Sequence, residues 1–138
     1  MTAHAKPDFS GEYALNKDAS TLGPGASSVR SAVVRIDHEE PRVRLHGAFH
    51  FDGSTFDYSL ERVSDGREVA DGKDPPTTSS LRWDGDALVF VDRTDAVDAP
   101  IAMSWRYELD AVGRRLTAVE RMRGGGHDQD NVWVFERR

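Results

Sequence analysis

The chain of 138 residues contains no cysteine. This absence excludes a disulfide framework, a thiolate zinc site and a thiol nucleophile. No apolar run is long enough to cross a membrane as a helix, and the opening stretch from Met1 to Pro7 has no apolar core that could act as a signal peptide. We therefore expect a soluble, cytoplasmic protein.

An excess of positive charge is missing as well. The 18 Lys and Arg residues are outnumbered by 24 Asp and Glu residues, and the formal net charge is -6. Nucleic acids and anionic membranes bind concentrated positive surfaces. The composition therefore predicts no nucleic-acid partner and no membrane partner.

Segments with the period of an amphipathic helix are also absent, and glycine turns take their place. Four turn signals separate stretches in which apolar and polar residues alternate: Asp52-Gly53, Asp65-Gly66, Asp84-Gly85 and Val112-Gly113. Alternation with a period of two is typical of half-buried strands, and Asp-Gly is a strong hairpin signal. The pattern predicts an all-β, antiparallel meander of about ten short strands.

A meander of this length manages its strand edges best by closing on itself. We predict an up-and-down β-barrel in which the last strand pairs with the first. A flexible segment over residues 1–8 would precede a single barrel domain over residues 9–138. A sandwich of two sheets is the alternative, but successive hairpin turns count against the crossings that it needs.

The hairpin at Asp52-Gly53 gives the clearest register. It places Phe49 opposite Phe56 and Gly47 opposite Tyr58 on an apolar face, and it pairs Arg44 with Glu61 on the wet face. A glycine opposite a tyrosine predicts a strand bend, or a ring that covers bare backbone.

Two later hairpins follow the same logic. A two-residue turn at Asp84-Gly85 would pair Leu81 with Leu88 and Ser79 with Phe90. The turn at Val112-Gly113 would pair Trp105 with Glu120, and also Leu109 with Leu116, Tyr107 with Ala118 and Met103 with Met122.

Several of these stretches resemble a known group of proteins. They run from Phe9 to Ser20, from Leu81 to Val89, from Trp105 to Thr117 and from Val132 to Arg137. They are similar to the opening, middle, late and closing strands of small bacterial lipocalin-like proteins of the calycin type, although Tyr13 stands where those proteins usually have Trp. The resemblance implies a barrel related in shape to lipocalins and fatty-acid-binding proteins, with one internal cavity. Most such bacterial proteins have no established role, so the resemblance supplies no function.

Aromatic residues of the predicted inner face have the character of a ligand-cavity lining, mostly apolar with a few hydroxyl groups. They are Tyr13, Phe49, Phe56, Tyr58, Phe90, Trp105 and Tyr107. In a smaller or collapsed barrel the same side chains would fill the core. A barrel with this number of strands is expected to enclose a space, which favours a cavity.

Three charged residues share that inner face and are the candidate catalytic groups. Glu120 could act as a general acid or base, or it could sit at a wet end of the barrel or pair with an arginine. Arg62 could anchor a ligand carboxylate, or its side chain could extend out of the barrel mouth. Asp92 would be a second internal carboxylate, unless Val89 and Val91 face inward instead.

Histidines offer little support for a metal or haem. His46 and His50 lie two apart on one strand, a spacing that suits a metal, but their face is polar and no third ligand is evident. His127 lies in the glycine stretch 124–127, which reads as a flexible connection. We expect no cofactor.

The sequence therefore predicts a barrel that binds one small, largely apolar molecule. The rival from another class is a cofactor-free enzyme (an isomerase, cyclase, lyase or hydrolase) that uses Glu120 in the same cavity. A third reading is an interaction module whose strand edges form a homodimer. Whether the protein is an enzyme is left open by the sequence.

Overall fold

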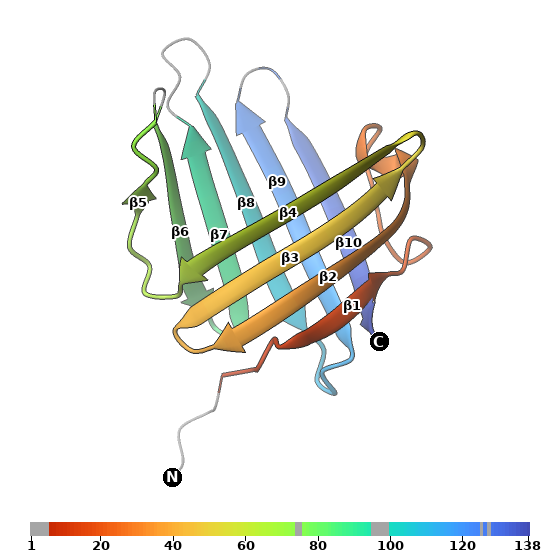
Figure 1. The fold of residues 1–138 in the computed structure, drawn as a ribbon, viewed down its shortest axis with the longest axis horizontal. Coiled ribbons are helices and arrows are strands. Elements are labelled where there is room, and N and C mark those ends of the chain that lie inside the picture. Colours follow the sequence, from red (N-terminus) through yellow and green to blue (C-terminus); the bar gives the residue numbers. More distant parts are fainter. Residues whose placement is uncertain (1–5, 74–75, 95–99, 125, 127) are drawn as a thin grey trace.

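Ten strands form one antiparallel sheet that curls into a barrel in the computed structural model (Figure 1). The structure describes residues 6–73, 76–94, 100–124, 126 and 128–138. The strands are β1 (Gly11–Leu15), β2 (Val29–Glu39), β3 (Arg42–Phe51), β4 (Ser54–Val63), β5 (Val69–Ala70), β6 (Thr77–Asp84), β7 (Ala87–Thr94), β8 (Ile101–Leu109), β9 (Arg115–Gly124) and β10 (Gln129–Arg137). The predicted all-β fold is confirmed.

Helical structure is limited, within the described residues, to the short 3₁₀ turn Ala26–Ser28. No helix of that part of the chain is long and apolar enough to cross a membrane. The division into a segment 1–8 and a domain 9–138 stays a prediction, and residues 1–5 lie outside the described residues.

The order of strands in the sheet is β4-β3-β2-β1-β10-β9-β8-β7-β6-β5. The first strand pairs with the last, as predicted, with Tyr13 opposite Arg137. Closure by hydrogen bonds is not complete, however. In the described ranges no ladder joins β4 to β5 or β6, and β5 is only two residues long. A side-chain hydrogen bond of 3.3 Å from Arg62 Nη2 to Ser79 Oγ links β4 to β6 instead.

The register of the β3–β4 hairpin is confirmed. Phe49 pairs with Phe56, Gly47 with Tyr58 and Arg44 with Glu61. The Tyr58 ring lies over Gly47, so that a Cβ at this glycine would overlap the ring. Of the two expectations for this pair, the ring that covers bare backbone holds.

The predicted β6–β7 register is wrong by two residues. Leu81 pairs with Phe90 and Ser79 with Asp92, because Gly85 and Asp86 form the turn instead of Asp84 and Gly85. Gly85 has a φ of 61°, which makes it suited to the first position of a tight hairpin turn. A shift of two residues leaves every side chain on its predicted face. The predicted β8–β9 register is confirmed, including Trp105 opposite Glu120.

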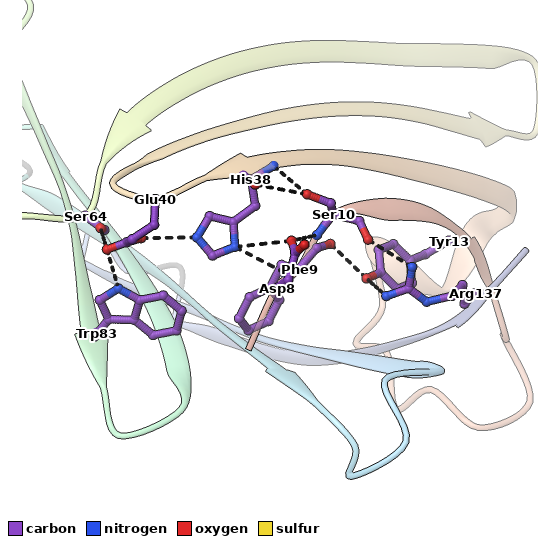
Figure 2. Close-up of polar contacts among 9 residues, drawn as sticks. All are labelled: Asp8, Phe9, Ser10, Tyr13, His38, Glu40, Ser64, Trp83 and Arg137. Carbon is purple, nitrogen blue, oxygen red and sulfur yellow. Dashed lines mark hydrogen bonds and ion pairs between the residues drawn. The ribbon is translucent and has the colours of Figure 1, made fainter. Parts of the chain in front are cut away.

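One end of the barrel is closed by packed side chains that form a polar network (Figure 2). We call this set the closed-end network: Asp8, Phe9, Ser10, Tyr13, His38, Glu40, Ser64, Trp83 and Arg137. Phe9 and Tyr13 are fully buried. The Tyr13 hydroxyl donates to the Phe9 carbonyl at 2.8 Å.

Arg137 fastens the segment before β1 to the end of β10. Its guanidinium donates to the Ser10 carbonyl at 2.9 Å, to the Tyr13 hydroxyl at 3.0 Å and to the Gly113 carbonyl at 2.7 Å. It also lies over the Tyr13 ring, 5.0 Å from the ring centroid. One side chain therefore joins the two ends of the chain and a neighbouring hairpin.

His38 and Glu40 form the other half of the closed-end network. The Phe9 backbone N–H donates to Nδ1 of His38 at 3.1 Å, so the ring proton lies on Nε2, which is 3.1 Å from Oε1 of Glu40. Oε2 of Glu40 accepts from Trp83 Nε1 at 3.0 Å and from Ser64 Oγ at 2.8 Å. Burial by itself raises the pKa of the Glu40 carboxyl, but these three hydrogen bonds outweigh it and hold the pKa below its ordinary value.

Candidate functional site

A cavity of about 360 Å³ lies inside the barrel. Its apolar wall comes from alternate residues of β3, β4, β7 and β8, and consists of Leu45, Phe49, Phe51, Phe56, Leu60, Phe90 and Met103. Four larger rings that carry a polar atom complete the wall, namely Tyr58, Trp105, Tyr107 and Trp133. Arg62, Asp92 and Glu120 are its charged members. A mostly apolar wall with a few polar groups is typical of small-molecule sites.

Strand alternation accounts for this composition. Residues two apart on one strand point to the same face of the sheet. On β4 the inner residues are Phe56, Tyr58, Leu60 and Arg62, and the outer residues between them, Asp57, Ser59 and Glu61, are polar. Phe56 is inner by register but 58% exposed, which places it at the mouth of the cavity.

Two tyrosines form a hydroxyl pair in the cavity wall. The hydroxyl groups of Tyr58 and Tyr107 lie near enough to influence each other's pKa. Burial raises the pKa of Tyr58, and it raises the pKa of Tyr107 well above the ordinary value, with the negative charge of Glu120 acting in the same direction on both. Each hydroxyl can donate one hydrogen bond and accept others, so the pair offers polar contacts to a ligand in the cavity.

Glu120 is held in place by β10. Its Oε1 accepts from Asn131 Nδ2 at 2.8 Å and from Trp133 Nε1 at 3.2 Å. Asn131 is 3% exposed, and its Oδ1 accepts the Gly23 backbone N–H at 2.7 Å. Both bonds to the carboxylate end on Oε1, and none of the described residues donates a hydrogen bond to Oε2.

Arg62 and Asp92 lie where the barrel is left open between β4 and β6. Arg62 donates to the Glu61 carbonyl at 2.9 Å and to Ser79 Oγ. Asp92 is the register partner of that serine on β7. Of the two orientations that the sequence left open for β7, the structure has Phe90 and Asp92 in the cavity wall.

The structure brings together nearly all residues that the sequence analysis singled out. Phe49, Phe56, Tyr58, Phe90, Trp105 and Tyr107 lie in the cavity wall with Arg62, Asp92 and Glu120. Tyr13 does not. It is inward by parity, but it lies at the closed end, where Phe9 and Arg137 cover it.

Sequence reasoning missed Trp133 and Asn131, which position Glu120. The run Val132-Trp133-Val134-Phe135 is apolar throughout, so its alternation indicates no inner face. The signal that could have found them is the pairing of β10 with β9, which puts Asn131 opposite Glu120.

The histidines form no metal site in the part of the chain that the structure describes. His46 and His50 are exposed on the outer face, and His46 Nδ1 lies 2.7 Å from Ser59 Oγ. No group of three His, Asp or Glu side chains within the described residues could hold a metal ion. His127, the histidine considered for haem, lies outside them, as does Gly125.

Known proteins resemble the chain in structure but not in sequence. No protein-family profile and no curated protein sequence matches it. Wild-type UnaG, a fluorescent protein, superimposes with a TM-score of 0.64 at 13% identity, over 94% of this chain and 97% of its own. The fatty-acid-binding protein of Manduca sexta superimposes with a TM-score of 0.55 at 14% identity, over 94% and 99%.

These two superpositions decide the fold. The chain has the fold of the fatty-acid-binding proteins. A secretory abundant heat soluble protein from Ramazzottius varieornatus, crystallised from a dimer sample, shares it with a TM-score of 0.64 at 10% identity over 94% of each chain. The identities are too low to carry more than the fold.

Proposed function

We propose that the protein binds one small, largely apolar molecule in the barrel cavity. The observation that carries this proposal is the cavity of about 360 Å³, whose wall consists mainly of phenylalanine, leucine, methionine, tyrosine and tryptophan side chains. A protein that needed only a stable core would gain free energy by filling such a space, because each buried cavity costs stability. The space is therefore best explained by an occupant.

The fold adds support. Two of the structural neighbours are named as fatty-acid-binding proteins, one from Manduca sexta and one from Echinococcus granulosus. The neighbour crystallised from a dimer sample supports a homodimer as a further part of the proposal, and the bacterial origin and cytoplasmic location stay predictions.

Substitution of Gly47 tests the proposal. In Gly47→Phe the new side chain pushes the Tyr58 ring into the cavity, so one ring or the other occupies the ligand's space. Binding of the neutral fluorescent dye Prodan should be lost, with at least a tenfold weaker Kd, while the circular dichroism spectrum keeps its β-sheet form.

Ala48→Phe is the matched control, because Ala48 is the next residue and lies on the outer face opposite Asp57. It should bind Prodan as the unaltered protein does. If Gly47→Phe does not fold, Gly47→Ala displaces the same ring by less and should weaken binding to a smaller degree. Equal Prodan affinity in the folded Gly47 variants and in Ala48→Phe would overturn the proposal.

A cofactor-free enzyme remains the second candidate, because the cavity wall holds Glu120 beside the Tyr58–Tyr107 hydroxyl pair. A carboxylate and a hydroxyl at one apolar site could move a proton on a bound molecule. Glu120→Gln would then abolish turnover of that molecule with little change in its affinity. The apolar wall alone is enough for a binding protein, which is why binding is the function proposed first.

A further inference from the structure

The charged groups of the cavity wall do not favour a ligand with an acidic head group. Among the described residues its wall carries one cation, Arg62, and two carboxylates, Asp92 and Glu120. Counted by formal charge, the wall has one more acidic side chain than basic ones. This balance disfavours a ligand with a carboxylate head group and favours one with a positive charge.

Arg62 is held at one side of the cavity. Two of the five N–H donors of its guanidinium are bonded to the Glu61 carbonyl and to Ser79 Oγ, at the gap between β4 and β6. Asp92, the register partner of that serine, lines the same cavity. The one cation of the described wall thus has acceptors of its own and an acid close by in the sheet.

Glu120, by contrast, is held in place through only one of its two carboxylate oxygens. Asn131 and Trp133 both donate to Oε1, which fixes the side chain from β10 and leaves Oε2 for another donor. Glu120 is half-buried, and a carboxylate next to apolar groups is stabilised by further hydrogen bonds, especially from charged donors. The arrangement is that of an acceptor held ready for a ligand.

Aromatic residues are neighbours of this carboxylate in the sheet and in the cavity wall. Trp105 is its register partner on β8, Trp133 donates to it from β10, and Tyr58 lines the same cavity. The faces of aromatic rings attract cations and repel anions. Charge balance, the incomplete carboxylate and the rings therefore favour the same kind of head group.

We propose that the ligand is an apolar amine, whose protonated nitrogen donates to Oε2 of Glu120 while its apolar body fills the cavity. This inference rests on the proposed function and deepens it by naming the ligand class. Tyr58 and Tyr107, which line the same cavity, would offer a hydroxyl group to a second polar atom of such a ligand.

Three ligands with the same alkyl chain test the proposal on the full chain. Decylamine, decanol and decanoic acid are each titrated against Prodan bound to the protein at pH 7, and the concentration that displaces half of the dye is measured. Decylamine should displace the dye at a concentration about tenfold lower than decanol, since a charge-assisted hydrogen bond outweighs a neutral one. Decanoic acid should be the weakest of the three.

Glu120→Gln then assigns the preference to one side chain. Glutamine keeps an oxygen that accepts from Asn131 and Trp133, but it removes the charge. The ratio of decylamine to decanol affinity, measured within the variant, should fall about tenfold. Glu108→Gln is the matched control, because it removes the same charge from the outer face of β8, where Glu108 pairs with Arg106 at 2.8 Å. Its ratio should equal that of the unaltered protein.

The outcomes separate this inference from the proposed function. Dye and decanol binding without a preference for the amine, or an unchanged ratio in Glu120→Gln, would overturn the amine proposal alone. Tighter binding of decanoic acid would overturn it in favour of Arg62 as the anchor. If neither the dye nor any of the three ligands binds, both proposals fall. The ratios in the unaltered protein decide the matter even if Glu120→Gln does not fold.

Discussion

Two glutamates, Glu40 at the closed end of the barrel and Glu120 in the cavity wall, differ in the hydrogen bonds that they accept. At the closed end Glu40 accepts hydrogen bonds on both oxygens, from His38, Trp83 and Ser64 (Figure 2). In the cavity Glu120 accepts two bonds on one oxygen. Both carboxylates lie beside tryptophan rings, so the aromatic setting alone does not separate them.

This difference separates a region that stabilises the fold from a region that can bind a ligand. The closed-end network is complete by itself, since its donors and acceptors find one another within the chain. The cavity wall, by contrast, borders on its inner side a space that its own side chains do not fill. We therefore expect changes at the closed end to act on stability, and changes in the cavity to act on binding.

Truncation of a phenylalanine at each place should give the largest contrast. Phe9 is fully buried, and Phe9→Ala should lower the free energy of unfolding by about 3 to 5 kcal/mol. Phe56 lines the cavity mouth and is 58% exposed, so Phe56→Ala should cost about 1 kcal/mol. Urea denaturation followed by tryptophan fluorescence measures both. Equal costs would remove the distinction between the two regions.

Loss of Arg137 should have the next largest effect. Arg137→Met keeps part of the apolar stem but leaves the Ser10 and Gly113 carbonyls and the Tyr13 hydroxyl without their donor. We expect a cost of about 2 to 3 kcal/mol in the same denaturation experiment. Arg138→Met is the adjacent control. It breaks one exposed ion pair with Glu12, 2.8 Å long, and should cost less than about 1 kcal/mol.

The smallest expected effect is a change in the pH dependence of stability. The pKa of Glu40 is lowered in the folded protein, so its charged form stabilises the fold above its ordinary pKa of 4.5, and this contribution is lost as the pH falls through the lowered value. Urea midpoints measured from pH 7 to pH 3 should fall less steeply below pH 4.5 in Glu40→Gln than in the unaltered protein.

Glu39→Gln provides the control for that series. Glu39 is the exposed last residue of β2, directly before Glu40, and its replacement should leave the slope as in the unaltered protein. A parallel course of the Glu40→Gln and Glu39→Gln curves would show that the three hydrogen bonds to Glu40 do not couple the fold to pH.

The sheet could be predicted from sequence because its signals are local. Alternation around Asp52-Gly53 fixed which residues of β3 and β4 face each other, down to Arg44 and Glu61. At Asp84-Gly85 the same reasoning placed the turn one residue early and shifted the pairs by two. The alternation of apolar and polar residues cannot reveal this error, because a shift by two residues leaves the alternation unchanged.

The sequence predicted which face of its strand each candidate residue lies on, but not how far along the barrel the residue lies. Alternation put Glu120 and Tyr13 on the inner face, and both are on it. It could not tell that Tyr13 lies under Arg137 at the closed end, since position along the barrel depends on how far strands are offset from one another. Trp133 escaped for a different reason, because a strand that is apolar on both faces carries no alternation to read.

The two termini of the chain and the two edges of the sheet lie at different places in the barrel. Followed in the order of the sheet, the strands run from β5 to β10 and then from β1 to β4. The two termini therefore belong to the middle of the sheet, where Tyr13 pairs with Arg137, and the two sheet edges belong to the middle of the chain, where residues 64–68 connect them. The ladder of β1 with β10 bridges the gap in the backbone, and the connection from β4 to β5 bridges the gap in the ladder. The ring is thus continuous all the way round, with one kind of bond taking over where the other stops.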